Sequence, residues 1–251
     1  MTATILITGG TGKFGRQFVR HFANKGWQIL FTTTSQNNAD SLIKELADDS
    51  CLIPLIVDFT QPQAALELVK RIKDDGYRVN HLINNARSRS FLQTDSLGQA
   101  SREDFLAEYL LDVVVPYELS MALFNTQPSE LITITNIGSQ YGIVAANPAL
   151  YEEYPKQSPI QYGVAKAALI HLTKELAVRF AKLDIRVNCI AYGGVSGRVD
   201  ECFEDRYAQL NPSGRMLSDS DIIGPLDFLV SDNCKAINGQ TIQADGGWTL
   251  W

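Results

Sequence analysis

Residues 5–15 read ILITGGTGKFG, and this stretch carries the strongest structural signal in the chain. An apolar run typical of a buried strand leads directly into glycines at positions 9, 10, 12 and 15. Phe14, Phe18 and Phe22 then recur every fourth residue, which predicts the apolar face of a helix over residues 13–26. In doubly wound α/β folds, a glycine turn between the first strand and the first helix holds the diphosphate of a dinucleotide, because glycine permits φ > 0 and close approach of backbone N–H groups. The stretch therefore predicts a dinucleotide site near the beginning of the chain.

Short apolar segments alternate with amphipathic segments along the rest of the chain. Besides the first strand at 4–8 and the first helix at 13–26, we expect strands at 27–34, 51–59, 79–85, 130–138 and 185–194, a last strand within 237–248, and helices at 38–49, 63–76, 102–124 and 160–183. Strands that are apolar at nearly every position are typical of a parallel sheet covered on both faces. With no internal repeat or linker, the pattern predicts an α/β fold with one Rossmann-type domain over residues 1–251, a doubly wound parallel sheet with helices on both faces.

The composition narrows the classes of partner. The 251 residues carry a net charge of −6, which argues against nucleic acid or an anionic membrane as the main partner. No apolar run reaches the roughly 18 residues of a membrane-spanning helix, and the N-terminus lacks the pattern of a secretory signal. The four cysteines are scattered and the three histidines show no ligand spacing with them, so we expect no metal site. We therefore expect a cytoplasmic protein that acts on a small molecule and binds neither nucleic acid nor membrane.

Further motifs follow the glycine loop, Thr8 to Gly15, in a fixed order. They are VDFT with Asp58, NNAR at 84–87, NIGS ending in Ser139, YGVAK from Tyr162 to Lys166, VNCIAYGGV at 187–195 and INGQTIQADGGW at 237–248. Over nearly the whole chain this set resembles the short-chain dehydrogenase/reductase family. The resemblance implies an enzyme that transfers a hydride between a nicotinamide and a carbonyl or secondary alcohol.

The catalytic residues implied by the resemblance are Ser139, Tyr162 and Lys166. Tyr162 and Lys166 stand four residues apart in the expected helix, so both side chains leave the same face. A free phenol has a pKa of about 10, and a nearby ammonium favours the phenolate, so such a pair suits proton transfer. In the family, the tyrosine exchanges a proton with the substrate oxygen, the serine hydrogen-bonds that oxygen and the lysine also holds the cofactor ribose. Asp112 stands where the family usually has an asparagine that supports a proton relay, and we expect its charge to couple to Lys166.

The resemblance also implies which residues contact the cofactor. They are Gly9, Gly12, Lys13, Phe14 and Gly15 in the glycine loop, Ser35 after the second strand, Asp58 and Phe59 after the third, Asn84, Asn85 and Ala86 after the fourth, Tyr162 and Lys166, and Gly193 and Val195 after the sixth. NAD-specific folds commonly end the second strand with an acid that bonds both ribose hydroxyls. Residues 31–38 contain no acid, and Lys13 offers a positive charge for a 2′-phosphate beside the adenosine ribose. We therefore expect NADP, with NAD as the alternative.

Arg87 and Arg89 depart from the family pattern. Arg87 replaces the glycine of the family's NNAG segment, and Arg89 follows two residues later. The two arginines are either exposed loop cations or an anion clamp at the mouth of the cleft. A clamp would suit a phosphorylated, nucleotide-linked or carboxylate substrate.

Two segments are expected to form the substrate side of the cleft, residues 140–161 and 193–216. The first is longer than the family usually has between Ser139 and Tyr162, and its part from Gly142 onward contains three prolines and the tyrosines Tyr151 and Tyr154. An insertion of this kind resembles the subgroup associated with flagellin modification and bacterial sugar biosynthesis. The substrate expected from this subgroup is a sugar or an anionic metabolite.

Other classes of function remain as alternatives. One is a catalytically silent dinucleotide-binding regulator, although such proteins typically lose the tyrosine or lysine that this chain keeps. Another is a sugar-nucleotide epimerase or dehydratase, whose G-x-x-G-x-x-G spacing this loop shares but which usually has a separate substrate domain. An enoyl reductase is disfavoured because those relatives space tyrosine and lysine more widely. We also expect a homodimer or homotetramer, formed through the apolar faces of 102–124 and 160–183.

Overall fold

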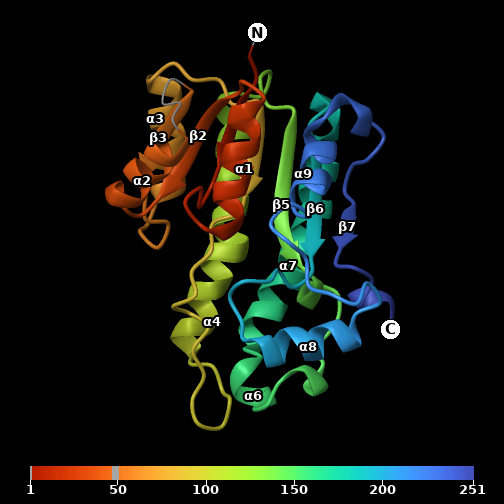
Figure 1. Cartoon of the computed structure of the whole chain (residues 1–251). Helices are drawn as coiled ribbons and strands as arrows, with labels where there is room; N and C mark the ends of the chain where they lie inside the picture. The colour runs from red at the N-terminus through yellow and green to blue at the C-terminus, as the bar shows by residue number, and fades with distance from the viewer. Residues whose placement is uncertain (1, 47–50) are drawn as a thin grey trace.

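Within residues 2–46 and 51–251, which the computed structural model describes, seven parallel strands form a sheet through the middle of the molecule (Figure 1). The strands are β1 (Thr4–Ile7), β2 (Gln28–Thr33), β3 (Leu52–Ile56), β4 (His81–Asn84), β5 (Thr133–Ser139), β6 (Arg186–Tyr192) and β7 (Thr241–Ala244). Their order is β3-β2-β1-β4-β5-β6-β7, so the winding reverses between β1 and β4. In sheets of this kind a ligand cleft opens at the carboxyl ends of the strands beside the reversal.

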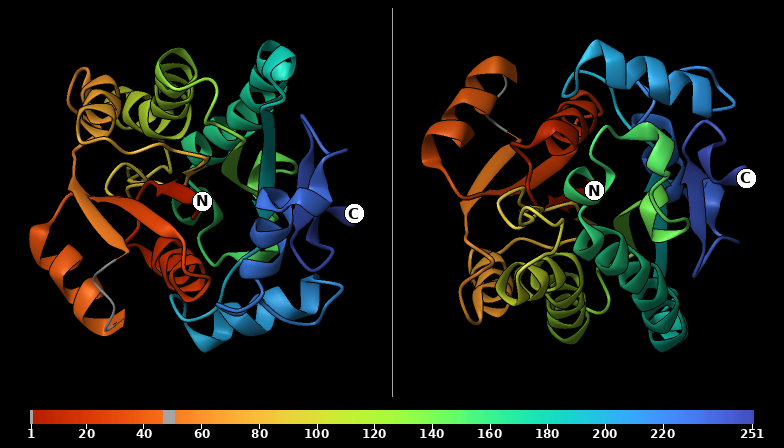
Figure 2. Two further views of the ribbon diagram at one scale, coloured as in Figure 1. Left: turned by 90° about the horizontal axis from the view of Figure 1, so that it is seen from above. Right: turned by 90° about the horizontal axis from the view of Figure 1, so that it is seen from below.

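Helices cover both faces of the sheet (Figure 2). On one face lie α3 (Ala64–Asp74), α5 (Val115–Thr126) and α7 (Ile160–Phe180), and on the other lie α1 (Lys13–Asn24), α2 (Gln36–Leu46) and α9 (Ile223–Val230). Neighbouring residues of β1 serve opposite cores, since Leu6 packs with the first set of helices and Ile5 with the second. Because both faces are covered, the strands are apolar at successive positions, and the predicted doubly wound parallel sheet with helices on both faces is confirmed.

The first helix shows why the sequence periodicity was informative. Phe18 and Phe22 of α1 are fully buried against the sheet, and Phe14 is half-buried at the end of the helix that faces the cleft. The other predicted helices and strands are also present, with ends that differ by a few residues. The predicted helix over 38–49 is seen as α2, and its residues 47–49 lie outside the described part of the chain.

The long helix expected over 102–124 is interrupted. It consists of α4 (Arg102–Tyr109), a π-helical turn η1 (Leu110–Val114) and α5. Pro116 explains the interruption, because it has no N–H to donate to the carbonyl of Asp112 four residues earlier. The wider π turn places the Asp112 side chain inside the protein.

The two segments expected as loops contain helices. Residues 140–161 include the short turns η2 (Gln140–Gly142) and η3 (Pro148–Leu150) and the helix α6 (Tyr154–Gln157), and residues 193–216 include α8 (Glu201–Leu210). Asp200 begins α8 by accepting the Phe203 N–H at 2.8 Å. Arg206 of α8 donates to the Leu150 carbonyl at 2.9 Å, so the two segments dock on each other. Further 3₁₀ turns are η4 (Ala181–Leu183), η5 (Asp232–Cys234) and η6 (Trp248–Leu250). No helix among the described residues has both the length and the apolar character needed to cross a membrane.

Candidate active site

The glycine loop between β1 and α1 is fastened to the end of β4. The Thr8 hydroxyl accepts the N–H groups of Asn85 and Ala86 at 2.9 and 2.8 Å, and the Asn85 amide donates to the Thr8 carbonyl at 2.8 Å. Gly9 lies at φ +66°, and a Cβ there would stand 2.9 Å from the Ala86 Cα. Any other residue at this position would therefore force the two segments apart.

Gly15 allows α1 to pack directly against the backbone of the same loop. It lies in the first turn of α1, where a Cβ would overlap the Gly9 carbonyl and stand 2.7 Å from the Gly10 Cα. Gly12 occupies the N-cap position and has no side chain to cover the first N–H groups of the helix. These N–H groups can donate hydrogen bonds to an anion such as a diphosphate.

A cleft of about 650 Å³ opens at the carboxyl ends of the central strands. Of the site residues expected from the sequence, those that line it are Gly9, Gly12, Lys13, Phe14, Asp58, Phe59, Asn85, Ala86, Ser139, Tyr162, Lys166, Gly193 and Val195. Gly15, Ser35, Asn84 and Asp112 are not among the lining residues. No group of His, Cys, Asp or Glu side chains in the described part of the chain is arranged to hold a metal ion.

Asn84 and Ser35 were expected to contact the cofactor, and their side chains have other partners. The buried Asn84 amide donates to Asn136 at 2.8 Å, and Asn136 donates to Thr173 at 2.9 Å, which makes a polar chain beneath the cleft. The Ser35 hydroxyl accepts the Asn38 N–H at 3.3 Å at the start of α2. Neither side chain lines the cleft: Asn84 bonds a neighbouring side chain, and Ser35 bonds the backbone at the start of α2.

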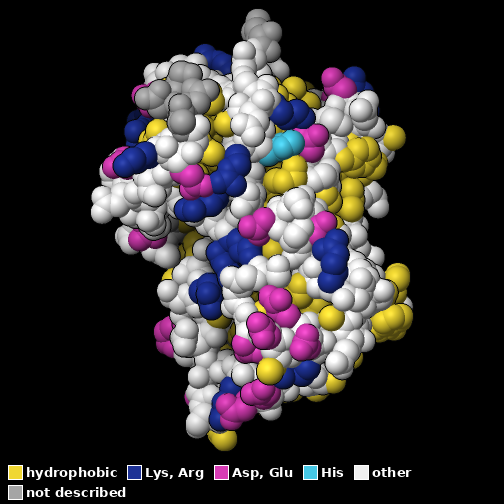
Figure 3. Space-filling view, in the orientation of Figure 1, with side chains coloured by type: hydrophobic (Ala, Val, Ile, Leu, Met, Phe, Trp, Pro, Cys, Tyr) yellow, Lys and Arg dark blue, Asp and Glu magenta, His cyan; other side chains and the backbone are white. Residues whose placement is uncertain are grey.

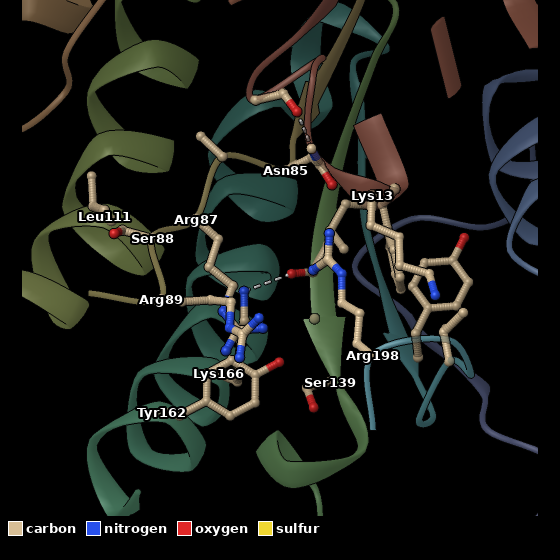
Figure 4. Close-up of a pocket in the computed structure, with 18 of the residues that line it drawn as sticks. Lys13, Asn85, Arg87, Ser88, Arg89, Leu111, Ser139, Tyr162, Lys166 and Arg198 are labelled. Atoms are coloured by element: carbon tan, nitrogen blue, oxygen red, sulfur yellow. Dashed lines mark hydrogen bonds between the residues drawn. The ribbon is translucent and has the colours of Figure 1, made fainter. Parts of the chain in front are cut away.

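Ser139, Tyr162 and Lys166 meet in the cleft (Figure 4). Ser139 is the last residue of β5, and the other two lie in the first turns of α7. The Lys166 Nζ is 5.7 Å from the centre of the Tyr162 ring. The fold thus brings together the three residues whose types and order suggested proton transfer.

A buried ion pair stands behind the cleft. The Lys166 ammonium donates to Asp112 Oδ1 at 3.0 Å and to the Ile137 carbonyl at 2.9 Å. Burial disfavours the ammonium, but the Asp112 carboxylate together with Tyr162 outweighs this effect and raises the pKa of Lys166. The predicted coupling of Asp112 to Lys166 is confirmed.

Glu108 belongs to the same region, and the sequence analysis missed it. It lies one helical turn before Asp112, is fully buried, and neither of its carboxylate oxygens has a hydrogen-bond partner among the described residues. Burial and then the Asp112 charge raise the pKa of Glu108 to about 7, against the opposing effects of Arg87 and Lys166. A glutamate in an amphipathic helix ordinarily faces water, so only its i,i+4 spacing from Asp112 gave a hint.

Tyr207 of α8 was also missed, because no helix was expected there. Its hydroxyl donates to Gln140 Oε1 at 2.8 Å and accepts the Gly194 N–H at 2.9 Å. Its ring stacks on Trp248 with the centroids 4.4 Å apart, and burial raises the pKa of the phenol to about 12. Tyr207 therefore joins the segments after β5 and β6 to the C-terminal turn.

Lys13 differs from the expectation that placed it beside the adenosine ribose. Its ammonium donates to the Ser196 carbonyl and lies 3.5 Å from Asp219 Oδ1. Both partners lie beyond β6, whereas the cleft near the end of β2 is lined by Thr34 and Asn38 among others. The Lys13 ammonium therefore contacts the segment after β6, and not the end of β2 as the sequence suggested.

Comparison with known proteins places this geometry among oxidoreductases. A family model described as enoyl-(acyl carrier protein) reductase matches residues 13–249. The post-translational flagellin modification protein A of Campylobacter coli is 27% identical over 258 residues, which cover 98% of each chain. The 3-oxoacyl-[acyl-carrier-protein] reductase FabG of Haemophilus influenzae is 27% identical over 250 residues, covering 98% of this chain and 97% of the relative.

Solved structures share the fold over almost the whole chain. A short-chain dehydrogenase from Leptospira borgpetersenii with bound NAD⁺ superimposes with a TM-score of 0.86 at 27% identity, covering 99% of this chain and 93% of the other. ElxO with bound NADP superimposes with a TM-score of 0.84 at 24% identity, with both chains fully covered. The fold is therefore found with either nicotinamide cofactor.

Proposed function

The chain belongs to the short-chain dehydrogenase/reductase family of oxidoreductases, and we propose that it transfers a hydride between NADP and a carbonyl or secondary alcohol at Ser139, Tyr162 and Lys166. The observation that carries this proposal is the position of these three side chains in the same cleft as the glycine loop. Separate sites would not allow hydride and proton transfer to one substrate.

The chemistry of the three side chains follows from their donors. When bound, the nicotinamide supplies or accepts the hydride. The Tyr162 hydroxyl donates a proton to the carbonyl oxygen in the direction of reduction, and the Ser139 hydroxyl donates a hydrogen bond to the same oxygen. An ammonium has three N–H groups, and Lys166 uses two of them on Asp112 and Ile137. The third remains for Tyr162 or a ribose hydroxyl, so Lys166 supports the proton donor electrostatically.

Removing only the phenol tests the proposal. We expect Tyr162→Phe to lower the rate of NADPH oxidation with a 3-oxoacyl thioester by at least about 100-fold, because general acid catalysis contributes roughly 10²–10⁴. Dinucleotide affinity, measured by nicotinamide fluorescence, should change less than threefold. Tyr109→Phe is a matched control, because Tyr109 lies at the end of α4 and is not among the cleft-lining residues. A Tyr162→Phe enzyme that keeps most of its activity would rule out the proton-donor role.

NADP is proposed over NAD because the end of β2 carries no acid. Segment 31–38 instead offers hydroxyl and amide groups, and Thr34 and Asn38 line the cleft there. A carboxylate at this place would repel a 2′-phosphate. Separate fluorescence titrations with NADPH and NADH compare the two cofactors, and tighter binding of NADH would reverse the assignment.

The match to the enoyl reductase model favours one other activity, reduction of a carbon–carbon double bond. Carbonyl chemistry is preferred because Tyr162 and Lys166 are four residues apart on α7, closer than enoyl reductases of this family space them. Assaying a 2-enoyl thioester beside the 3-oxoacyl thioester distinguishes the two. Turnover of the enoyl substrate alone would favour the alternative.

We also propose a homodimer or homotetramer acting in the cytoplasm. The helices α5 and α7 expose apolar side chains that support such contacts, among them Tyr117, Val164 and Val178. Light scattering after size-exclusion chromatography gives the mass directly. A mass near 28 kDa, that of one chain, would contradict the oligomer.

A further inference from the structure

Three arginines from two separate loops line the cleft, Arg87 and Arg89 beside Tyr162 and Arg198 on the side of Lys13 (Figure 4). Arg87 and Arg89 lie between β4 and α4, and Arg198 lies between β6 and α8. The Arg87 guanidinium carbon is 4.2 Å from the centre of the Tyr162 ring. Arg89 and Arg198 line the same cleft as Arg87, Tyr162 and Ser139.

None of these arginines forms a direct ion pair within the described part of the chain, although Arg87 lies near enough to Glu108, and Arg198 to Asp219, for their charges to interact. The other two cations of the cleft have acidic partners, Asp219 for Lys13 and Asp112 for Lys166. None of the ion pairs found among residues 2–46 and 51–251 includes Arg87, Arg89 or Arg198. The cleft is thus locally positive in a chain whose net charge is −6.

The arginines are close enough to repel one another. Partial burial and then the charges of Arg89 and Arg87 lower the pKa of Arg198, and Asp219 only partly opposes this. Asp58 is the single acidic residue among the described residues that line the cleft. The space-filling view shows basic side chains between α1 and α8, with acidic side chains beside them (Figure 3). All three arginines are exposed at the mouth of the cleft, so water and salt screen much of their repulsion, and a bound anion would relieve what remains.

We propose that Arg87, Arg89 and Arg198 form a subsite for a carboxylate or phosphate group of the substrate. A guanidinium presents a planar fork of N–H donors that matches two oxygens of such a group. The subsite rests on the proposed function and adds the substrate class to it. Arg87 and Arg89 depart from the family pattern in the sequence, whereas Arg198 joins them only in the folded protein.

The contact between Arg87 and Tyr162 limits the distance between the anionic group of the substrate and its reacting carbonyl. An anion held by Arg87 lies next to the side chain that protonates the carbonyl oxygen. Among carbonyl substrates, 3-oxoacyl thioesters included, the subsite therefore favours an oxo acid or a phosphorylated carbonyl compound, in which the anionic group lies only a few bonds from the reacting carbon. An uncharged carbonyl compound would leave the three arginines without a counterion.

A cofactor diphosphate is the other anion that these arginines could hold, and binding measurements separate the two sources. The protein saturated with NADP⁺ is titrated by calorimetry with malonate and, separately, with inorganic phosphate at constant ionic strength. We expect saturable binding of at least one probe, weakened tenfold or more by Arg87→Gln, by Arg89→Gln and by Arg198→Gln. The affinity for NADP⁺ should change less than threefold in each variant.

Arg78→Gln is the matched control, since Arg78 is exposed and precedes β4 at the opposite end of that strand. It should leave the affinity for both probes unchanged. Absence of saturable probe binding in the NADP⁺ complex would overturn the subsite, as would variants that weaken NADP⁺ as much as the probe. Failure of the wild-type protein to bind any dinucleotide would instead refute the proposed function, so the two failures are distinguishable.

Discussion

Replacing Glu108 by glutamine should remove a strong pH dependence from the stability of this fold. Burial beside Asp112 raises the pKa of Glu108 from an ordinary value of 4.5 to about 7. Through this group the folded protein binds more protons than the unfolded chain between these two values, so stability falls as the pH rises. Below pH 4.5 the titration of Glu108 does not change the free energy of unfolding. Between pH 4.5 and about pH 7 it lowers that free energy progressively, and above about pH 7 the loss is constant. At about 1.4 kcal/mol per pKa unit, the full loss is about 3 kcal/mol.

The glutamine side chain has nearly the same shape and does not titrate. The difference in unfolding free energy between wild type and Glu108→Gln should therefore shift by about 3 kcal/mol in favour of the variant between pH 4.5 and pH 8. Urea denaturation followed by circular dichroism at several pH values measures this difference. Glu108→Leu should show the same change with pH, because it also removes the titrating group. Parallel pH profiles for wild type and both variants would show that Glu108 is ionised in the fold and refute the reasoning.

A matched control for this experiment lies on the same helix. Glu103 is in the first turn of α4 and is exposed, so Glu103→Gln removes the same charge without a buried site. Its unfolding free energy should follow that of the wild type across the pH range. A change as large as that of Glu108→Gln would assign the effect to the net charge of the helix.

Three further predictions follow from the packing around the cleft. Gly15→Ala should cost about 2 kcal/mol or more of stability in urea denaturation and weaken NADPH binding in fluorescence titrations, because the new Cβ overlaps the Gly9 carbonyl. Tyr207→Phe should cost about 1–2 kcal/mol, since two hydrogen-bonding groups after β5 and β6 lose their shared partner, and thermal unfolding measures the loss. Asp112→Leu should cost about 3–5 kcal/mol in urea denaturation, because it leaves the Lys166 ammonium buried without its carboxylate. A Gly15→Ala protein with unchanged NADPH affinity, or either of the other variants with unchanged stability, would contradict the corresponding packing argument.

Local pattern in the amino-acid sequence was enough for most of the fold. Short runs that are apolar at nearly every position predict the strands, and apolar residues that recur every three or four positions predict the helices. The glycine loop was also recognisable from the sequence. A side chain at Gly15 would collide with the backbone of Gly9 and Gly10, and one at Gly9 would collide with the backbone after β4. The i,i+4 spacing of Tyr162 and Lys166 likewise predicted that both would face one cleft.

Other features depend on which distant segments pack together, and no local pattern encodes that. Lys13 meets Asp219 rather than the end of β2, because the segment after β6 folds over the glycine loop. Glu108 is buried because other segments cover its helix at that position, and its carboxylate has no hydrogen-bond partner within residues 2–46 and 51–251.

The proposed arginine subsite depends on tertiary packing in the same way. Arg87 and Arg198 are more than a hundred residues apart in the chain, and they meet because parallel strands bring the loops after β4 and β6 to the same edge of the sheet. The order of the motifs therefore predicts the family and the proposed chemistry, since those residues belong to short recurrent patterns. The charge of the substrate side depends on tertiary packing, because electrostatic interaction follows distance in space and not separation along the chain.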